Sequence, residues 1–490
     1  MNRSSPGQDY VVQTSPLHGL PRRQMPFIPV FAQSIAAVAP SGCASVIPLL
    51  MLSTTGGGAA LVGFVCAIAV ILLVSACLRP MAQRMAAVGG IYSFTARGLG
   101  PEVAVPTGWS ALVGYAAVSM AGLLAVGTYL AHIAVASGLA PTTSTTAIVG
   151  IVLVAAALAT VVMVRGIAVS AWITLLIECV SIALVGAVLV LLVVRNDHSP
   201  HAISAAMEWG NSWHGIKFNI VVAVAAFVGF ESSTTLSREA KRPFLTIPRT
   251  LRWTPVAVAV LYLFAVPIQA IAMSSAPAAV RDSAAPLAEL LAHNGSTALS
   301  TVLDLGIAAS FFACTLASVN ALVRVLICMG REGVAPARLG RTHLRFQTPA
   351  PAVVTAMALI TIGPLGVLLT GISPDQGLLA FLTLSGCGYL GSYLAGCAAA
   401  PVLLRRIGES TRGVWITSGV ATSALLILLL SVSYVAVRDH AIPLVAYGII
   451  MCAAVCYTFV LKRFAPHRLA AVGIYDETEW NDLSKTGLFR

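Results

Sequence analysis

The sequence predicts an all-α polytopic membrane protein with twelve transmembrane helices. Of its 490 residues, 58% are hydrophobic and only 10% are charged, which leaves too little polar surface to cover a soluble globule of this size. Apolar stretches of roughly 20 residues, the length that a helix needs to cross a bilayer, recur along nearly the whole chain. These stretches lack the ten-residue alternation of polar and apolar residues that marks an outer-membrane barrel, so they are expected to be helices.

The apolar stretches divide the chain into two halves of five spans, followed by two more spans. The predicted spans are 27–52, 59–78, 103–137, 146–164, 168–194, 216–236, 250–274, 300–329, 349–370, 377–404, 413–436 and 441–461. The predicted order is a cytoplasmic tail (1–26), a first repeat with spans one to five (27–194), an outer loop (195–215), a second repeat with spans six to ten (216–404), two further spans (405–462) and a cytoplasmic tail (463–490).

Basic residues set the expected orientation. If the N-terminus is cytoplasmic, most of the 29 Lys and Arg residues fall in inner segments, and the exceptions expected outside are Arg195, Lys217, Arg281 and Arg438. This positive-inside pattern accounts for the net charge of +11 without nucleic acid as a partner. It favours the bacterial inner membrane as the location, with both termini cytoplasmic. The first 26 residues lack the apolar core of a removable signal peptide.

Two spans are interrupted at corresponding positions of the two halves. Span one is interrupted at 40–43 (Pro-Ser-Gly-Cys) and span six at 228–231 (Val-Gly-Phe-Glu). Because five is an odd number, two halves of five spans have opposite membrane topology, as in the inverted repeats of many secondary transporters. A broken helix survives in lipid only where it lines a cavity, so the two breaks predict a binding site near the midplane.

Four blocks of sequence carry a family resemblance. They are Pro80-Met81-Ala82 with Gly89-Gly90-Ile91-Tyr92-Ser93, then 226–233 with Arg238-Glu239-Ala240-Lys241-Arg242-Pro243 and Ile247-Pro248-Arg249, then Asn320-Ala321-Leu322-Val323-Arg324 with Met329-Gly330-Arg331-Glu332-Gly333 and Pro336, and finally Leu403-Leu404-Arg405-Arg406. Taken together and in this order, the blocks resemble the amino acid-polyamine-organocation permeases. The resemblance covers roughly residues 27–462.

The resemblance implies a leucine-transporter-like five-plus-five inverted repeat with broken spans one and six. It also implies uptake or exchange of amino acids or related amines, without fixing the substrate. Two departures stand out: Pro40 replaces a glycine that family members often carry, and Ala225 stands where the arginine/agmatine exchangers have a tryptophan. The missing tryptophan disfavours arginine exchange.

The expected function is secondary active import of amino acids, by proton symport with alternating access. The runner-up is a transporter or exchanger of polyamines or other organic cations, and the alternative of another class is a channel or a transport-inactive amino acid sensor. An enzyme is not expected, because no convincing nucleophile, metal or phosphate-binding constellation occurs. The expected partners are a small amino acid or amine and the lipid bilayer. No cofactor is expected, and protons, or alternatively sodium ions, would drive transport.

Backbone groups at the two breaks are expected to bind the substrate. The residues at this expected site are Ser41, Gly42, Cys43, Phe227, Val228 and Gly229. Free amides of the first three would cradle a carboxylate at the positive end of a half-helix. Unwound carbonyls near Phe227 and Val228 would hold an ammonium group. The alternative for span one is a kink at Pro40 that serves packing alone.

Two acids inside spans are candidates for proton coupling or gating. Glu231 follows the break in span six and resembles an acid that several family members use in gating or proton sensing; its alternative role is a helix cap. Glu178 in span five has no basic neighbour in sequence and would carry a proton, or equally bind sodium, pair with Arg324 or be structural. Ser310 and Thr315 in span eight form a possible cation site, with interhelical packing as the alternative.

The remaining polar features are interpreted as structural. All ten cysteines fall in predicted spans, which implies no disulfide framework. The segment 386–391 (Gly-Cys-Gly-Tyr-Leu-Gly) fits a dinucleotide fingerprint, but no strand precedes it, so helix packing explains it better. No metal site is expected, since nothing converges on His198 and His201. Asp304 is expected at the membrane interface. The acids of the C-terminal tail are expected to be solvated: Asp476, Glu477, Glu479 and Asp482.

Overall fold

The computed structural model describes residues 17–52, 55–139, 141–195, 203–204, 206–208, 213–281, 286–293, 295–438 and 442–478. These residues fold into helices and connecting loops, and the β-bridges among them are isolated ones, Met25 with Ala240 and Ala86 with Asp476. The helices are α1 (Phe27–Val38), α2 (Pro40–Leu52), α3 (Gly57–Ala82), α4 (Ile91–Leu99), α5 (Pro101–Ala136), α6 (Thr145–Arg165), α7 (Ile167–Arg195), α9 (Trp213–Ala225), η1 (Ser232–Leu236), α10 (Pro243–Ser274), α11 (Ala278–Arg281), α12 (Pro286–His293), α13 (Thr297–Glu332), η2 (Ala337–Gly340), α14 (Ala350–Leu369), α15 (Pro374–Arg406), α16 (Arg412–Arg438), α17 (Ile442–Phe464) and α18 (Pro466–Ala470).

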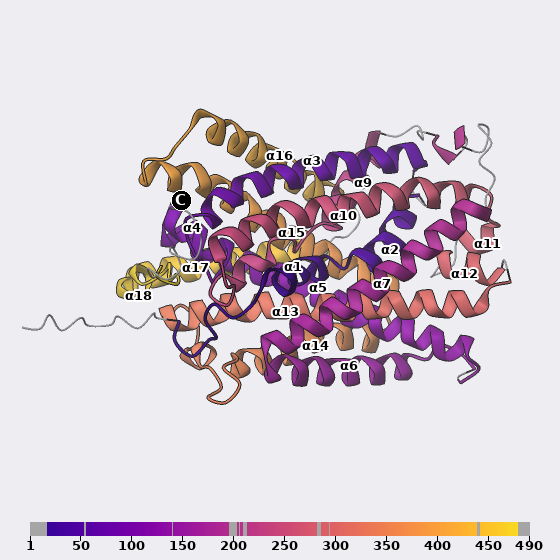
Figure 1. Ribbon diagram of the computed structural model, residues 1–490, viewed down its shortest axis with the longest axis horizontal. Coiled ribbons are helices and arrows are strands. Elements are labelled where there is room, and N and C mark those ends of the chain that lie inside the picture. The colour runs from indigo at the N-terminus through magenta and orange to yellow at the C-terminus, as the bar shows by residue number, and fades with distance from the viewer. Residues whose placement is uncertain are drawn as a thin grey trace, which may run out of the picture.

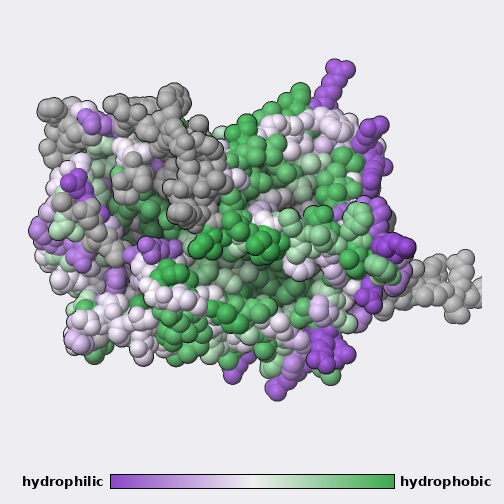
Figure 2. Space-filling view, turned by 180° about the vertical axis from the view of Figure 1, so that it is seen from behind, coloured by the Kyte–Doolittle hydropathy of each residue, from purple (hydrophilic) through white to green (hydrophobic). Residues whose placement is uncertain are grey.

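The long helices run along the long axis of the molecule (Figure 1). α4 and α18 lie at one end, and α11 and α12 lie at the other. Hydrophobic residues cover much of the middle of the face in Figure 2, whereas hydrophilic residues gather toward the ends, above all at the end with α4 and α18. In the described chain, 11 helices are long and apolar enough to cross a membrane. The protein is therefore a multi-pass membrane protein.

The predicted count of twelve spans is not confirmed, because of the segment predicted as span six. This segment, 216–236, forms the 13-residue helix α9, a series of turns and the five-residue 3₁₀ helix η1. Neither helix reaches the roughly 20 residues of a continuous span. The 11 candidate helices match the other predicted spans, with α1 and α2 together forming the first. The five-plus-five inverted repeat stays a prediction.

α5 and α13, each of 36 residues, form the centre of the bundle. α13 is buried along almost its whole length and packs against α1, α5 and α7, while α15 packs along α5. A Cβ added to Gly388 of α15 would lie 2.4 Å from the Gly114 amide nitrogen of α5. The Ser110 hydroxyl donates to the Gly388 carbonyl at 2.7 Å. The glycine motif of 386–391 thus serves helix packing, as predicted.

One carboxylate ties both ends of the chain to the α4 end of the bundle. Asp476 is completely buried and forms ion pairs with Arg22 at 3.3 Å, Arg23 at 2.9 Å and Arg238 at 2.5 Å. The expectation of a solvated tail is therefore wrong for Asp476, since three guanidinium groups offset the loss of water around its charge. Glu477 is exposed as expected. The other two acids of the tail lie outside the described residues: Glu479 and Asp482.

A second buried acid at this end is also bonded to the tail. Glu332, the last residue of α13, accepts hydrogen bonds from the amides of Gly473 and Ile474, both at 2.8 Å, and from the Tyr92 hydroxyl. Burial and the neighbouring Glu332 carboxylate raise the pKa of Tyr92 well above its ordinary value, so this phenol acts as a donor. The C-terminal tail is thus an integral part of this end of the fold.

Candidate functional site

The break in the first span lies at Ala39. α1 ends at Val38, Ala39 has the left-handed φ of 51°, and α2 begins at Pro40. Proline is favoured as the first residue of a helix because its missing N–H needs no partner there. The interruption predicted at 40–43 therefore exists, one residue earlier than expected. As a result, the first turn of α2, with its amides free of intrahelical partners, lies in the middle of the span.

The second break lies at 226–231, between α9 and η1. Gly229 has a φ of 92°, which a residue with a Cβ rarely adopts. A Cβ added there would also lie 2.9 Å from the Ala37 carbonyl oxygen, at the end of α1. Nearby, the Ser233 amide donates to the Ser34 hydroxyl at 3.2 Å. The segments on either side of the two breaks are therefore in contact with each other.

Glu178 of α7 lies against the start of α2. Its Oε2 accepts a hydrogen bond from the Ser41 hydroxyl at 3.3 Å, and its Oε1 accepts one from the Ser310 hydroxyl of α13 at 2.7 Å. The Gly42 amide donates to the same Ser310 hydroxyl at 3.3 Å. Glu178 is only 3% exposed, and none of the ion pairs in the described chain includes it. The predicted proton-coupling acid, two predicted substrate-binding residues and one residue of the predicted cation site are thus joined by hydrogen bonds. This group, called the carboxyl network below, consists of Glu178, Ser41, Gly42 and Ser310.

This carboxyl network can respond to a proton. The first turn of α2 is the positive end of a helix, where free amides and the helix dipole stabilise an anion. A ligand carboxylate at these amides would be repelled by an ionised Glu178, but would accept a hydrogen bond from a protonated one. The protonation of a single side chain would therefore decide whether an anionic group fits at the start of α2.

Glu231 is held by two phenols from different helices. Its Oε1 accepts a hydrogen bond from Tyr115 of α5 at 2.9 Å, and its Oε2 accepts one from Tyr393 of α15. The Gly229 amide donates to the Tyr393 hydroxyl at 3.2 Å. Sequence reasoning missed both tyrosines. The available signal was a phenol inside an apolar span, where the hydroxyl needs a partner. The second break is thereby linked to α5 and α15.

The other predicted site residues surround this network. The Cys43 amide donates to the Ala39 carbonyl at the break, at 2.8 Å, so the expectation that this amide is free is wrong. The Phe227 ring packs edge-on against the Tyr262 ring, with centroids 5.0 Å apart, and Val228 is also buried. The hydroxyl of Thr315 donates to a carbonyl one turn back in α13, at 3.1 Å. The structure therefore does not bring Thr315 into the carboxyl network.

Arg324 pairs with an acid other than Glu178. Its guanidinium donates to Glu239 through Nη2 at 2.9 Å and through Nε at 3.1 Å, and both side chains are almost completely buried. The suggested pairing of Arg324 with Glu178 is therefore wrong, because Glu239, just after η1, takes that place. The ion pair joins the second broken segment to α13.

Metal ligands do not gather in the described chain. No group of three or more His, Cys, Asp or Glu side chains in these residues could hold a metal ion. The two histidines weighed as loop ligands, His198 and His201, lie outside the described residues.

Comparisons with known proteins identify transporters and permeases as relatives of the chain. A family model described as amino acid permease matches residues 27–465. The chain is 27% identical to an uncharacterized transporter of Mycobacterium tuberculosis over 57% of its own length and 60% of that protein, which is thus matched over less than two thirds of its length. It is 22% identical to a branched-chain amino acid permease of Bacillus subtilis, over 79% of this chain and 83% of that protein. A D-serine/D-alanine/glycine transporter of Escherichia coli is 28% identical, over 34% of this chain and 37% of that protein.

Proposed function

The chain belongs to the amino acid permease family, and we propose that it imports amino acids by proton symport. The observation that carries this proposal is the buried carboxyl group of Glu178, bonded to Ser41 and Ser310 at the break between α1 and α2. Membership of a permease family also agrees with the expectation that the chain is not an enzyme. The names of relatives point to small or apolar amino acids as substrates. The proposed location is the cell membrane, with both termini cytoplasmic.

The proposed cycle uses both breaks. A proton on Glu178 lets the substrate carboxylate approach the amides of Ser41 and Gly42 without like-charge repulsion, and the carboxylate then replaces Ser310 as the acceptor for the Gly42 amide. Carbonyls near Phe227 and Val228 accept hydrogen bonds from the ammonium group, which needs such partners in low dielectric. Movement about the breaks then exposes the site to the opposite side of the membrane. Loss of the proton there restores repulsion and releases the amino acid.

Uptake by proteoliposomes tests the proposal. Wild-type protein is supplied with a radiolabelled amino acid mixture under an inward proton gradient or an inward sodium gradient. The proposal expects proton-driven accumulation. Accumulation with sodium alone would make Glu178 part of a sodium site. Uptake of polyamines instead of amino acids would favour the organic-cation transporter. Absence of uptake under both gradients, together with absence of substrate counterflow, would favour a sensor. Flux without counterflow would indicate a channel.

Gly42→Leu is expected to abolish uptake. A Cβ at Gly42 would lie 2.9 Å from the Phe311 ring, so a larger side chain must push α2 away from α13. The amide of residue 42 would then lose Ser310, and the Ser41 contact with Glu178 would open. Gly150→Leu makes the same change at a glycine with no atom within 4 Å of the added Cβ, and it should leave uptake unchanged. Undiminished uptake by Gly42→Leu would support a kink that serves packing alone.

A further inference from the structure

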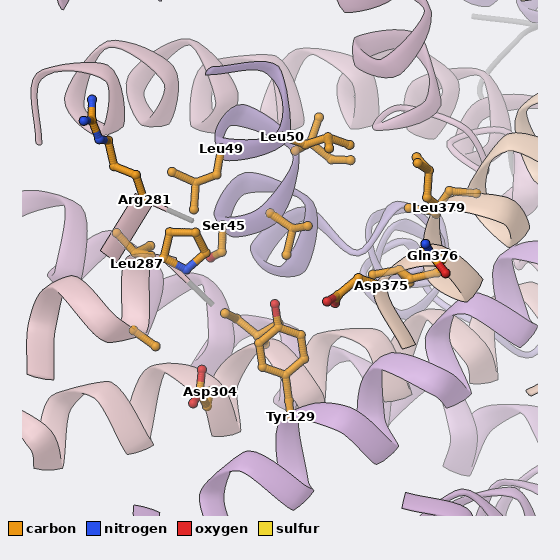
Figure 3. A pocket seen from close by; sticks show the side chains of 17 residues that line it. Ser45, Leu49, Leu50, Tyr129, Arg281, Leu287, Asp304, Asp375, Gln376 and Leu379 are labelled. Carbon is orange, nitrogen blue, oxygen red and sulfur yellow. The ribbon is translucent and has the colours of Figure 1, made fainter. Parts of the chain in front are cut away.

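A pocket of about 490 Å³ opens on the side of the breaks that faces α11 and α12 (Figure 3). Residues of α2, α5, α11, α12, α13 and α15 line it. Ser45 and Ile307, which belong to its lining, lie about one helical turn from Ser41 and Ser310, respectively. The pocket, here called the Asp304 pocket, therefore ends about one turn short of the carboxyl network.

Asp304 of α13 has a buried carboxylate oxygen that lacks a partner. It is only 6% exposed, and its Oδ1 is enclosed without a hydrogen-bond partner. No ion pair in the described chain includes it, and the charged group that acts on it electrostatically is another acid, Glu289 of α12. Asp304 is therefore enclosed by neighbouring side chains. A buried carboxylate needs hydrogen-bond donors or a cation, and no ion pair of the described residues gives Asp304 one.

Two further polar groups face the same space. The Tyr129 hydroxyl points into the pocket between Asp304 and Asp375, as Figure 3 shows. Asp375, near the start of α15, is exposed at the mouth of the pocket and within electrostatic reach of His132. The Arg281 guanidinium also belongs to the lining, but Figure 3 shows that it is directed away from both carboxylates. The polar groups that converge on the pocket can therefore accept hydrogen bonds from a cation.

Most of the rest of the lining is apolar. Leucines and other aliphatic side chains form an apolar wall: Val46, Ile47, Leu49, Leu50, Leu287, Ile307, Leu378, Leu379 and Leu382. A small hydrated metal ion would gain nothing from this wall. An organic ammonium compound is stabilised in two ways, because its charge is attracted to the carboxylates and its hydrocarbon part is removed from water. The volume also suits a molecule of the size of an amino acid.

We propose that the Asp304 pocket binds the ammonium group of an amine or amino acid with an apolar side chain, at a site separate from the two breaks. Asp304 would accept from the ammonium group at the bottom of the pocket, with Tyr129 and Asp375 as further acceptors. The aliphatic wall would hold the side chain. Such a site would collect ammonium compounds before they reach the carboxyl network.

Three compounds with the same branched hydrocarbon end test this proposal. They are 3-methylbutylamine, which carries only an ammonium group, leucine, which carries both charges, and 4-methylpentanoate, which carries only a carboxylate. Binding is measured by calorimetry on the purified full-length protein in nanodiscs. The amine and leucine are expected to bind, and the acid is not. Equal binding of acid and amine, or absence of amine binding, would overturn the proposal.

Asp304→Asn locates the site. It keeps the size of the side chain and removes a charged acceptor, so amine affinity is expected to fall about tenfold or more. Glu102→Gln removes one negative charge from the exposed opposite end of α5 and should leave affinity unchanged. Amine affinity that is the same in Asp304→Asn and wild type would refute the assignment. The measurement uses no gradient, so it stands whether or not the chain transports amino acids.

Discussion

Glu178→Gln protein is expected to lose proton-driven accumulation of amino acids, down to the level of liposomes without a gradient. Glutamine keeps the shape of the side chain and can still bond to Ser41 and Ser310, but it cannot release a proton. Substrate counterflow needs no net proton transfer, so it is expected to continue. The measurement is uptake of a radiolabelled amino acid mixture by proteoliposomes, with and without an inward proton gradient, next to counterflow in the same preparation.

Ser310→Ala is the matched control for this prediction. It removes one hydrogen bond to Glu178, at 2.7 Å in the structure, and leaves the carboxyl group in place. Proton-driven uptake should weaken but persist. If Glu178→Gln accumulates amino acids as well as wild type under a proton gradient, Glu178 is not the proton carrier. If Glu178→Gln loses both counterflow and accumulation, Glu178 is instead required for the structure of the site.

Glu239→Gln is expected to destabilise the protein by about 3–5 kcal/mol, since it leaves the charge of Arg324 buried without its counter-ion. In the structure the two side chains are 3% and 0% exposed, and their closest approach is 2.9 Å. Water cannot replace the lost carboxylate at this depth. The measurement is chemical unfolding of the purified protein in mixed micelles, followed by tryptophan fluorescence.

Two comparisons sharpen this prediction. Glu239→Leu combined with Arg324→Met removes both charges and should recover much of the lost stability, because two apolar side chains need no counter-ion. Glu102→Gln breaks the pair with Lys462, in which both side chains are more than half exposed, and should change stability by less than about 1 kcal/mol. A Glu239→Gln protein as stable as Glu102→Gln would contradict the role assigned to the buried pair.

Features of local sequence could be predicted closely. The first break was placed within one residue, because Pro40 cannot donate a backbone hydrogen bond and so marks a helix start. The second followed from Gly229 beside Glu231 in an apolar stretch, where a glycine and an acid are both unusual. Helix geometry could also have rejected the pairing of Ser310 with Thr315. Residues five apart on an α-helix point roughly 140° away from each other.

Contacts between distant parts of the chain could not be predicted. Glu178 and its hydrogen-bond partner Ser41 are 137 positions apart, and the sequence around neither residue indicates that the two side chains are in contact. The same holds for Arg324, whose expected partner was wrong because the distance to Glu239 depends on how the second broken segment folds back. In sequence, Asp304 looks like an ordinary acid near the end of a span, and Asp476 looks like an ordinary tail acid. Only the packing of other elements decides that they are buried.

The ion pairs of Asp476 have a consequence for protein synthesis. The ribosome makes the chain from its N-terminal side, so Arg22 and Arg23 emerge long before Asp476, which lies 454 positions after Arg22. The carboxylate that joins them does not exist until the residues between them have been made. This end of the bundle therefore cannot reach its final arrangement before Asp476 is added, and a chain that terminates earlier would lack the contact.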